Sequence, residues 1–380
     1  MTFFIILFTL IVLLWLVALY CLSGADLSRF DSKLEDVAND VFDSHQEDSE
    51  HSKKILTKLA DVRQQAIASK SISKGLKIAR EFADKLSYDL VTDTKFIPVI
   101  ANGVNCEWAV ASNADPKKRI VFINGGAFLF GSPTGHRKFT DQLSRLANAA
   151  VLAVDYRKLP RHSRAASIQD AQQAYLWALE NGPKNKEPLD FLVVSGDSAG
   201  GNLAHMLASW SENQNLRKPD CVVSFSPSLD KTFSSPILQT NQASDPILGQ
   251  GLSLLTKLPK PLRLWVLLIS MRMAPANPLV SPIFSDLSCL PPTLIHASSS
   301  EMLLGESIRY TNKARSQGAD VRLQIWRDQV HDWHLFNMGF GSANVAWNEV
   351  AKFISEQQAA LNLLPDSIEN DANSEQHALA

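Results

Sequence analysis

Residues 196–200 read Gly-Asp-Ser-Ala-Gly, which places a nucleophilic hydroxyl between two glycines in the pattern G-x-S-x-G. The apolar residues 191–194 precede this motif, and a helix-compatible run at residues 202–210 follows it. A buried strand that turns sharply into a helix at such a motif forms a nucleophile elbow, in which the glycines make room for a tight turn. The context therefore predicts that Ser198 is the nucleophile of a covalent catalytic mechanism.

A serine hydroxyl is a poor nucleophile until a neighbouring base takes its proton and a carboxylate orients that base. In chains with this elbow the order is serine, acid, histidine, each on a loop at the carboxyl edge of a parallel sheet. Downstream of Ser198, a strand expected at residues 293–297 is followed by Glu301, and one at residues 321–326 is followed by His331. We therefore predict a triad of Ser198, Glu301 and His331.

Both partners of the serine have alternatives nearby in the sequence. Glu306 lies within the helix expected after Glu301, where a solvated surface position is the simpler interpretation. Asp328 lies three residues before His331 on the same loop, and it would have to fold back to orient that histidine. His334 lies three residues after His331, where a turn or the start of a helix is expected. Glu301 and His331 are therefore preferred.

The tetrahedral intermediate of acyl transfer carries a negative oxygen, which needs preorganised N–H donors. The N–H of Ala199, directly after the nucleophile, is one candidate. Gly125 and Gly126 follow a strand expected at residues 119–123 and offer the others, because glycine lets the backbone approach a substrate closely. Taken by themselves they fit an ordinary strand-to-helix turn, but the elbow and the downstream loops favour an oxyanion loop. Asp197 is assigned to structural hydrogen bonding.

The elements that must position these groups alternate between strands and helices from about residue 94 onward. We expect strands at residues 96–100, 106–110, 119–123, 150–155, 191–196, 221–225, 293–297 and 321–326, and helices near 138–148, 169–179, 307–317 and 343–357. This alternation predicts right-handed βαβ units and a mostly parallel sheet of the α/β class. It fails between residues 234 and 278, which we interpret as a cap inserted over the active site, or as a helix pair that completes the core.

The N-terminus carries a long apolar run, residues 3–20, interrupted only by Thr9. As a helix it is about 27 Å long, close to the hydrocarbon thickness of a bilayer. We predict a single-span membrane anchor. The alternative is a cleaved signal peptide, for which residues 23–25 supply small side chains, although the run is longer than usual and no basic residue precedes it.

The segment between this run and the strands is of two kinds. Residues 26–50 contain nine acidic side chains against Arg29 and Lys33, which predicts a solvated stalk or an exposed helix. Residues 52–83 have apolar side chains at helical spacing and predict one or two amphipathic helices, with Gly75 as the break between them.

Composition excludes several classes of function. The chain has 380 residues, 45% hydrophobic and 20% charged, which is ordinary for a globular protein. Its net charge of -2 and the lack of a Lys/Arg cluster argue against a nucleic-acid-binding surface. The four cysteines are scattered and the nine histidines form no metal-binding motif, so we expect no disulfide framework, no metal and no cofactor. Oligomeric state is left open.

Residues 103–336 resemble the hormone-sensitive-lipase-like branch of the α/β-hydrolases, which includes bacterial acetyl hydrolases and membrane-anchored steryl acetyl hydrolases. The matching stretches, in order, are Asn-Gly-Gly-Ala at 124–127, Gly-Ser-Pro at 131–133, Asp-Tyr-Arg at 155–157, Gly-Asp-Ser-Ala-Gly-Gly at 196–201, Ser-Pro-Ser-Leu-Asp at 226–230, Asp-Pro at 245–246, Ser-Pro at 281–282 and Ser-Glu-Met-Leu-Leu at 300–304. The resemblance implies an α/β-hydrolase fold and a Ser/acid/His esterase with a cap built from N-terminal helices plus an insertion.

Two residues depart from the family pattern in the oxyanion loop. Asn124 stands where the family has a histidine that supports the loop, and Ala127 replaces the third glycine. Gly125 and Gly126, the positions whose N–H groups the resemblance implies as donors, are retained. We expect a changed rate or acyl preference rather than loss of activity.

The sequence therefore predicts a serine carboxylic-ester hydrolase that acts on short-acyl, lipophilic esters. The alternatives are a non-catalytic ligand-binding relative, and an amidase or formamidase with the same triad. Its partners are a small-molecule ester and, through the N-terminal helix, a membrane. We expect an anchor or signal segment at residues 1–22, an acidic stalk and cap helices at 23–92, an α/β domain at 93–362 with a cap insertion at 234–278, and a flexible tail at 363–380.

Overall fold

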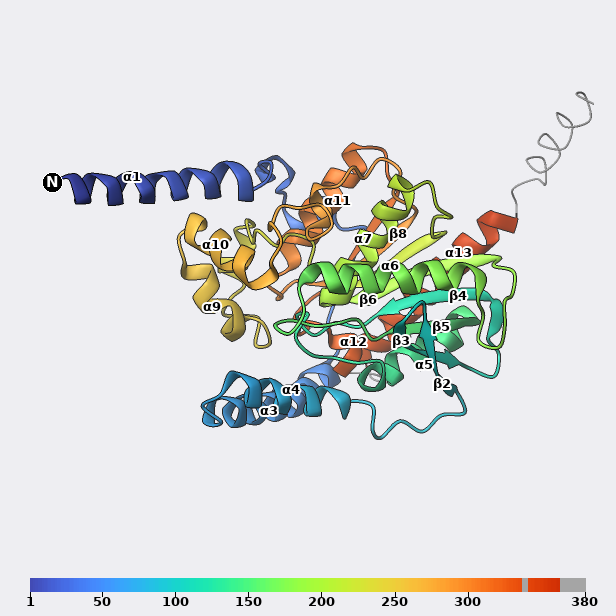
Figure 1. Cartoon of the computed structure of the whole chain (residues 1–380). Helices are drawn as coiled ribbons and strands as arrows, with labels where there is room; N and C mark the ends of the chain where they lie inside the picture. The colour runs from blue at the N-terminus through green and yellow to red at the C-terminus, as the bar shows by residue number, and fades with distance from the viewer. Residues whose placement is uncertain (337–340, 363–380) are drawn as a thin grey trace, which may run out of the picture.

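A computed structural model of the chain describes residues 1–336 and 341–362 (Figure 1). Its strands are β1 (Asp40–Phe42), β2 (Lys95–Ala101), β3 (Val104–Val110), β4 (Asp115–Ile123), β5 (Ala149–Val154), β6 (Phe191–Asp197), β7 (Cys221–Phe225), β8 (Thr293–Ser298) and β9 (Val321–Trp326). Within the described residues they form a sheet in the order β1-β9-β8-β7-β6-β4-β5-β3-β2. Neighbouring strands are parallel except that β3 runs antiparallel to β2 and β5.

The α-helices are α1 (Thr2–Val17), α2 (Leu34–Val37), α3 (Gln46–Ala68), α4 (Ile72–Asp84), α5 (Arg137–Ala147), α6 (Arg164–Glu180), α7 (Ser198–Asn213), α8 (Ile237–Thr240), α9 (Gly249–Lys257), α10 (Lys260–Met271), α11 (Leu304–Ser316), α12 (Trp333–Phe336) and α13 (Gly341–Asn362). A π-helical turn, η1 (Ala18–Leu22), and three 3-10 turns, η2 (Ser28–Phe30), η3 (Thr134–His136) and η4 (Pro282–Phe284), complete the helical elements described. The expectation of a mostly parallel sheet flanked by helices is confirmed.

The central strands are apolar on both faces because helices cover both sides of the sheet. Every residue of β5, β6, β7 and β8 is buried, as expected for parallel strands between two helical layers. Helices α6, α7 and α11 lie on one side, and α5 and α13 lie on the other (Figure 1). The carboxyl ends of β4, β6, β8 and β9 therefore meet along one edge.

An N-terminal helical hairpin and a second group of helices lie outside this layered body. Helices α3 and α4 pack against each other, and the break between them is at residues 69–71, where Lys70 has a φ of +51°. The expectation that Gly75 separates them is wrong. Gly75 lies inside α4, where a Cβ would lie 3.2 Å from the backbone oxygen of Ala66, so it allows close packing of the two helices. Helices α8, α9 and α10 occupy the region where the strand–helix alternation fails.

The apolar N-terminus is a helix that projects from the body (Figure 1). Residues Thr2–Leu22, α1 and η1 together, are long and apolar enough to cross a membrane by length and composition, and only 11% of its apolar window is buried. A signal sequence has the same character, so this observation supports an apolar N-terminal segment of either kind.

The expectation of a solvated stalk is wrong for residues 26–45, whereas residues 46–50 begin α3 and are helical, as the alternative expectation had it. Strand β1 pairs in parallel with β9 at the edge of the sheet, and the Phe42 ring stacks on that of Trp326 with centroids 4.5 Å apart. Asp31 forms an ion pair with Arg309 of α11 at 2.6 Å. The acidic residues are interleaved with apolar ones such as Val37, which is buried. A count of charged residues over the segment therefore does not reveal that its apolar side chains pack against the body. The predicted flexible tail at residues 363–380 lies outside the described residues.

The added edge strand is tested by Phe42→Ala. Removing the half-buried ring from its stack on Trp326 should lower the free energy of unfolding by about 2 kcal/mol, less than the cost for a fully buried phenylalanine. Val41→Ala, at an exposed position of the same strand, is the control and should cost less than about 1 kcal/mol. Urea unfolding in mild detergent measures both. Equal stability of the two variants would mean that the segment is not packed on the sheet.

Candidate active site

Strand β6 passes directly into α7 at Ser198, which gives the elbow expected from the sequence. Ser198 has a φ of +49°, in the left-handed region that non-glycine residues rarely adopt. A Cβ on Gly200 would lie 1.8 Å from the carbonyl oxygen of Ile123, and one on Gly196 would lie 2.5 Å from the carbonyl carbon of Gly200. Both glycines are therefore required, because the turn presses against the end of β4.

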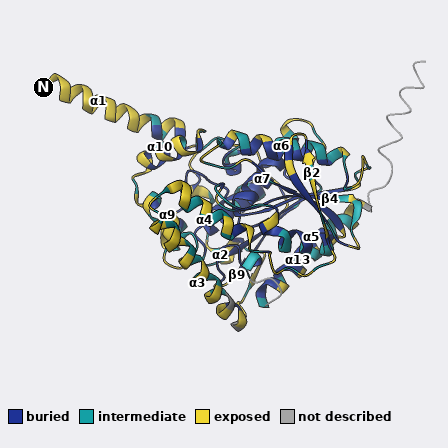
Figure 2. Cartoon of the chain, turned by 60° about the horizontal axis from the view of Figure 1, so that its bottom comes forward, coloured by how far each residue is buried: buried dark blue, intermediate teal, exposed yellow. Residues whose placement is uncertain are grey.

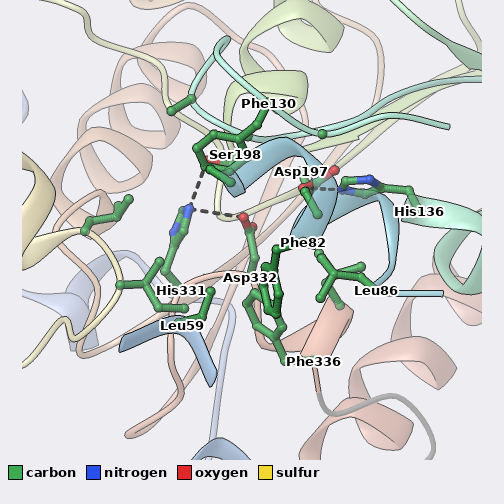
Figure 3. A pocket seen from close by; sticks show the side chains of 18 of the residues that line it. Leu59, Phe82, Leu86, Phe130, His136, Asp197, Ser198, His331, Asp332 and Phe336 are labelled. Atoms are coloured by element: carbon green, nitrogen blue, oxygen red, sulfur yellow. Dashed lines mark hydrogen bonds and ion pairs between the residues drawn. The ribbon is translucent and has the colours of Figure 1, made fainter. Parts of the chain in front are cut away.

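Three side chains from separate loops form a continuous chain of contacts at this edge, and Figure 3 shows the contact between Ser198 and His331. The Ser198 Oγ lies 2.9 Å from His331 Nε2, and His331 Nδ1 lies 2.7 Å from Glu301 Oε2. The other oxygen of Glu301 accepts the N–H of Ser298, at the end of β8, at 2.9 Å. All three side chains are buried. The structure thus brings together the three residues that the sequence singled out.

The other candidates for the acid and the histidine of the triad make different contacts. Glu306 is not solvated as expected: it is buried, and its Oε2 accepts the N–H groups of Leu229 and Asp230 at 2.6 and 2.9 Å. Burial raises the pKa of Glu306 to about 8. The ring of His334, in α12, lies 3.1 Å from the ring of His296. The Asp328 side chain is exposed, and its backbone N–H donates to Ser299 Oγ.

Sequence reasoning missed a second carboxylate at the histidine. Asp332 Oδ2 lies 3.1 Å from His331 Nε2, the nitrogen that also contacts Ser198 (Figure 3). Burial raises the pKa of Asp332 to about 7. Burial acts to lower the pKa of His331, but the carboxylates of Asp332 and Glu301 outweigh it and raise that pKa well above its ordinary value. The only signal in the sequence was that Asp332 directly follows His331, and Asp tolerates the left-handed φ of +56° found there.

In the loop after β4, the expectation that the Gly125 N–H is an oxyanion donor is wrong. The N–H of Gly125 donates to Asp197 Oδ1 at 2.9 Å, so it is not free for a substrate oxygen. In the part of the chain that the structure describes, the N–H groups of Gly126, Ala127 and Ala199 donate to no protein acceptor. Gly126 and Ala127 both line the cavity at Ser198. The available donors are therefore displaced by one residue along the loop, to Gly126 and Ala127.

Asp197 has the structural role expected for it. One of its oxygens holds Gly125, and the other lies 3.4 Å from His136 Nε2. Burial acts to lower the pKa of His136, but Asp197 outweighs it and raises that pKa. The side-chain amide of Asn124 donates to the carbonyl of Gly125 at 2.8 Å, and the backbone carbonyl of Asn124 accepts from the Tyr156 hydroxyl at 3.1 Å. The asparagine thus makes hydrogen bonds that hold the loop in place.

Two cavities meet at Ser198. The first, the hairpin-side cavity, has apolar walls that come mainly from α3, α4 and α12. The second, the cap-side cavity, has apolar walls that come largely from α9, α10 and the loops after β4 and β7. Ser198, Ala127 and Leu248 line both. The site can therefore receive an apolar molecule that extends on both sides of the reacting carbon.

Comparisons with known proteins agree with this geometry. A family model described as alpha/beta hydrolase fold matches residues 120–335. The chain is 31% identical over 256 residues to an esterase of Acinetobacter venetianus, covering 67% of this chain and 80% of the relative. It is 29% identical over 231 residues to an acetyl-hydrolase of Streptomyces hygroscopicus, covering 61% of this chain and 73% of the relative. A crystal structure of an esterase from the bacterial hormone-sensitive lipase family superposes with a TM-score of 0.66 at 25% identity, covering 80% of this chain and 98% of the other.

Substitution of Gly200 by alanine tests the steric constraint at the elbow. A Cβ that meets the Ile123 carbonyl oxygen at 1.8 Å cannot be accommodated without displacing β4 or α7, so we expect a loss of about 4 kcal/mol or more in folding stability. Gly251→Ala in α9 is the matched control, because a Cβ there meets no atom of the described residues within 4 Å and should stabilise the helix by about 0.5–1 kcal/mol. Yield of folded protein and urea unfolding measure both. Wild-type stability of Gly200→Ala would show that the elbow is not tightly packed.

Proposed function

Because this chain belongs to the α/β-hydrolase fold family, in its hormone-sensitive-lipase-like branch, we propose that Ser198, His331 and Glu301 hydrolyse carboxylic esters as nucleophile, base and orienting acid. The chain is an enzyme, a carboxylic ester hydrolase, which sets aside the non-catalytic alternative. The observation that carries the assignment of residues is the unbroken series of contacts at 2.9 and 2.7 Å, made by side chains from three separate loops.

The proposed reaction follows from the direction of these contacts. Ser198 Oγ attacks the ester carbonyl carbon while its proton moves to His331 Nε2, and the charge on His331 is stabilised by Glu301 at Nδ1. The carbonyl oxygen becomes an oxyanion. His331 then gives the proton to the departing alcohol oxygen, which leaves an acyl group on Ser198. Water, deprotonated by the same histidine, attacks the acyl carbon and releases the acid.

The oxyanion is stabilised by the N–H groups of Gly126, Ala127 and Ala199. Each such donor contributes about 3 kcal/mol to transition-state stabilisation when it is preorganised. Preorganisation here comes from Asp197, which holds the N–H of Gly125 at 2.9 Å and so ties the loop to the elbow. Asn124 supplements this by its own contact with the Gly125 carbonyl.

The substrate we propose is a lipophilic ester with a short acyl group. Both cavities at Ser198 have mainly apolar walls, which favours an apolar alcohol or acyl group over a charged one. The Streptomyces relative named an acetyl-hydrolase supports a short acyl group.

We further propose that residues 1–22 anchor the protein in a membrane. The α/β domain that follows occupies residues 93–362, and its cap insertion occupies residues 234–278. A cleaved signal sequence is the alternative for the N-terminus.

Ser198→Ala tests the nucleophile. Without the hydroxyl no acyl-enzyme forms, so turnover of p-nitrophenyl acetate should fall by roughly a thousandfold or more, and a fluorophosphonate probe should no longer label the protein. Ser209→Ala, on the same helix, is the control, because its hydroxyl has no hydrogen-bond partner among the residues that the structure describes, and it should be labelled normally. Undiminished labelling of Ser198→Ala would assign the nucleophile elsewhere.

The same assay with longer acyl chains tests the short-acyl preference, and turnover by the wild type should become slower as the acyl chain grows.

Asp332→Asn tests the electrostatics of the histidine. Asp332 and Glu301 both raise the pKa of His331, so removing one charge should lower that pKa. His331 acts as a base only when neutral, so the acid limb of the pH profile of kcat/KM should move to lower pH. Asp328→Asn, at an exposed position of the same loop, should leave the profile in place. An unmoved acid limb in Asp332→Asn would show that Asp332 does not act on His331.

A further inference from the structure

The cap is fixed to the apolar N-terminal helix. Ala18 and Leu22 of η1 are buried against Leu264 of α10. The indole N–H of Trp265 donates to the carbonyl of Leu14 at 3.1 Å. At 1.5 Å per residue, Leu14 lies about 12 Å before the end of the apolar helix at Leu22. If this helix spans a bilayer, its contacts at Leu14, Ala18 and Leu22 therefore hold α10 at the membrane and not in bulk water.

Helix α10 has two apolar stripes on different faces. Leu264, Leu267 and Met271, spaced by three and four residues, are buried, Leu264 against η1 and the other two beside the cap-side cavity. Leu262, Val266 and Ile269 have the same spacing on the outer face, where Ile269 is 72% exposed. Leu254 of α9 is 80% exposed, and Figure 2 shows exposed residues along α9. A helix that is apolar on nearly all sides is unusual at a water-exposed surface, so the outer stripe requires an apolar partner.

Basic residues and a second apolar contact surround this outer stripe. Lys257, Lys260 and Arg272 lie at the ends of α9 and α10 and are exposed, as in helices that rest on anionic headgroups. Ile67 and Ile72, 67% and 83% exposed, flank the turn between α3 and α4. In Figures 1 and 2 that turn lies at the same end of the molecule as α9 and α10, and α1 projects from this end.

The inner faces of the same two helices line the cap-side cavity. Leu252 and Leu255 of α9, together with Leu267 and Met271 of α10, form part of its wall, and Ser198 lies within it. Helices α9 and α10 therefore lie between the outer stripe and the cavity that contains the reacting hydroxyl.

We propose that the outer faces of α9 and α10, with the α3–α4 turn, rest on an anionic lipid bilayer beside the exit of α1, and that ester substrates enter the cap-side cavity directly from the lipid. This inference rests on the proposed membrane anchor. It assigns a surface and an entry route that the ester-hydrolase activity by itself does not require, since hydrolysis of a water-soluble ester needs neither.

Spin-label accessibility in vesicles tests the surface without using catalysis. The full chain with Cys21→Ser and Cys289→Ser, the two exposed thiols, receives Ile269→Cys on α10 or Ile100→Cys on β2. Each variant is labelled and reconstituted into vesicles of phosphatidylcholine and phosphatidylserine. The label at position 269 should be accessible to oxygen and shielded from a water-soluble nickel chelate, and the label at position 100 should show the reverse.

The outcomes separate the two proposals. Protein that does not float with the vesicles would overturn the anchor and the docked cap together. Protein that floats, but whose label at position 269 is as accessible to the nickel chelate as the label at position 100, would overturn the docked cap and leave the anchor and the ester hydrolysis standing.

The entry route is tested by a ratio of rates. Hexadecyl acetate dissolved in the same vesicles is compared with water-soluble p-nitrophenyl acetate, in the wild type, in Ile269→Asp and in the matched control Ile100→Asp. A charge at position 269 should lift the cap from the lipid, so the ratio of hexadecyl acetate to p-nitrophenyl acetate turnover should fall about tenfold or more. An unchanged ratio in Ile269→Asp, or an equal fall in Ile100→Asp, would overturn entry from the lipid.

Discussion

The left-handed backbone at Ser198 is the constraint on which the remainder of the site depends. A non-glycine residue in this region costs on the order of 1–3 kcal/mol, and it persists only where the surroundings hold it in place. Here β6 is hydrogen-bonded between β4 and β7, Gly200 fits against the Ile123 carbonyl, and the Ser198 carbonyl accepts the N–H of Ser228 at 3.1 Å. The hydroxyl is thereby held at the carboxyl edge of the sheet, where the loops after β8 and β9 also end.

Electrostatics at this edge depends on the exclusion of water. Asp332 and Glu301 lie on the two nitrogens of His331, and Asp197 lies beside His136, all of them buried. Burial disfavours the charged form of each of these groups. The attraction between each histidine and the carboxylates beside it offsets part of this cost. Asp197 joins the two parts of the site, since it follows the last apolar residues of β6 and also holds the loop that supplies the N–H donors. The proposed triad and oxyanion loop are thus coupled through one carboxylate.

The helices outside the sheet determine what reaches this edge. The α3–α4 hairpin walls one cavity at Ser198, while α9 and α10 wall the other. Because α10 is also fixed to the apolar N-terminal helix, the orientation of that helix in a membrane would orient the cap as well. Substrate selection and attachment to a membrane would then be properties of the same few helices.

Chain order and apolar patterning were sufficient to predict that Ser198, Glu301 and His331 lie together, because the loops after parallel strands meet at one edge whatever the details of packing. The same logic identified eight of the strands. It did not reveal β1, whose three residues lie within an acidic segment, or the burial of Glu306, for which the helical pattern predicted a solvated position.

Tertiary structure decided which groups face one another. The N–H of Gly125 is occupied by Asp197, and Asp332, with a left-handed backbone, contacts His331. The sequence determines the order in which functional residues arrive at the edge of the sheet. Their hydrogen-bond partners depend on side-chain directions and distances between loops, which are established only when the helices and strands pack together.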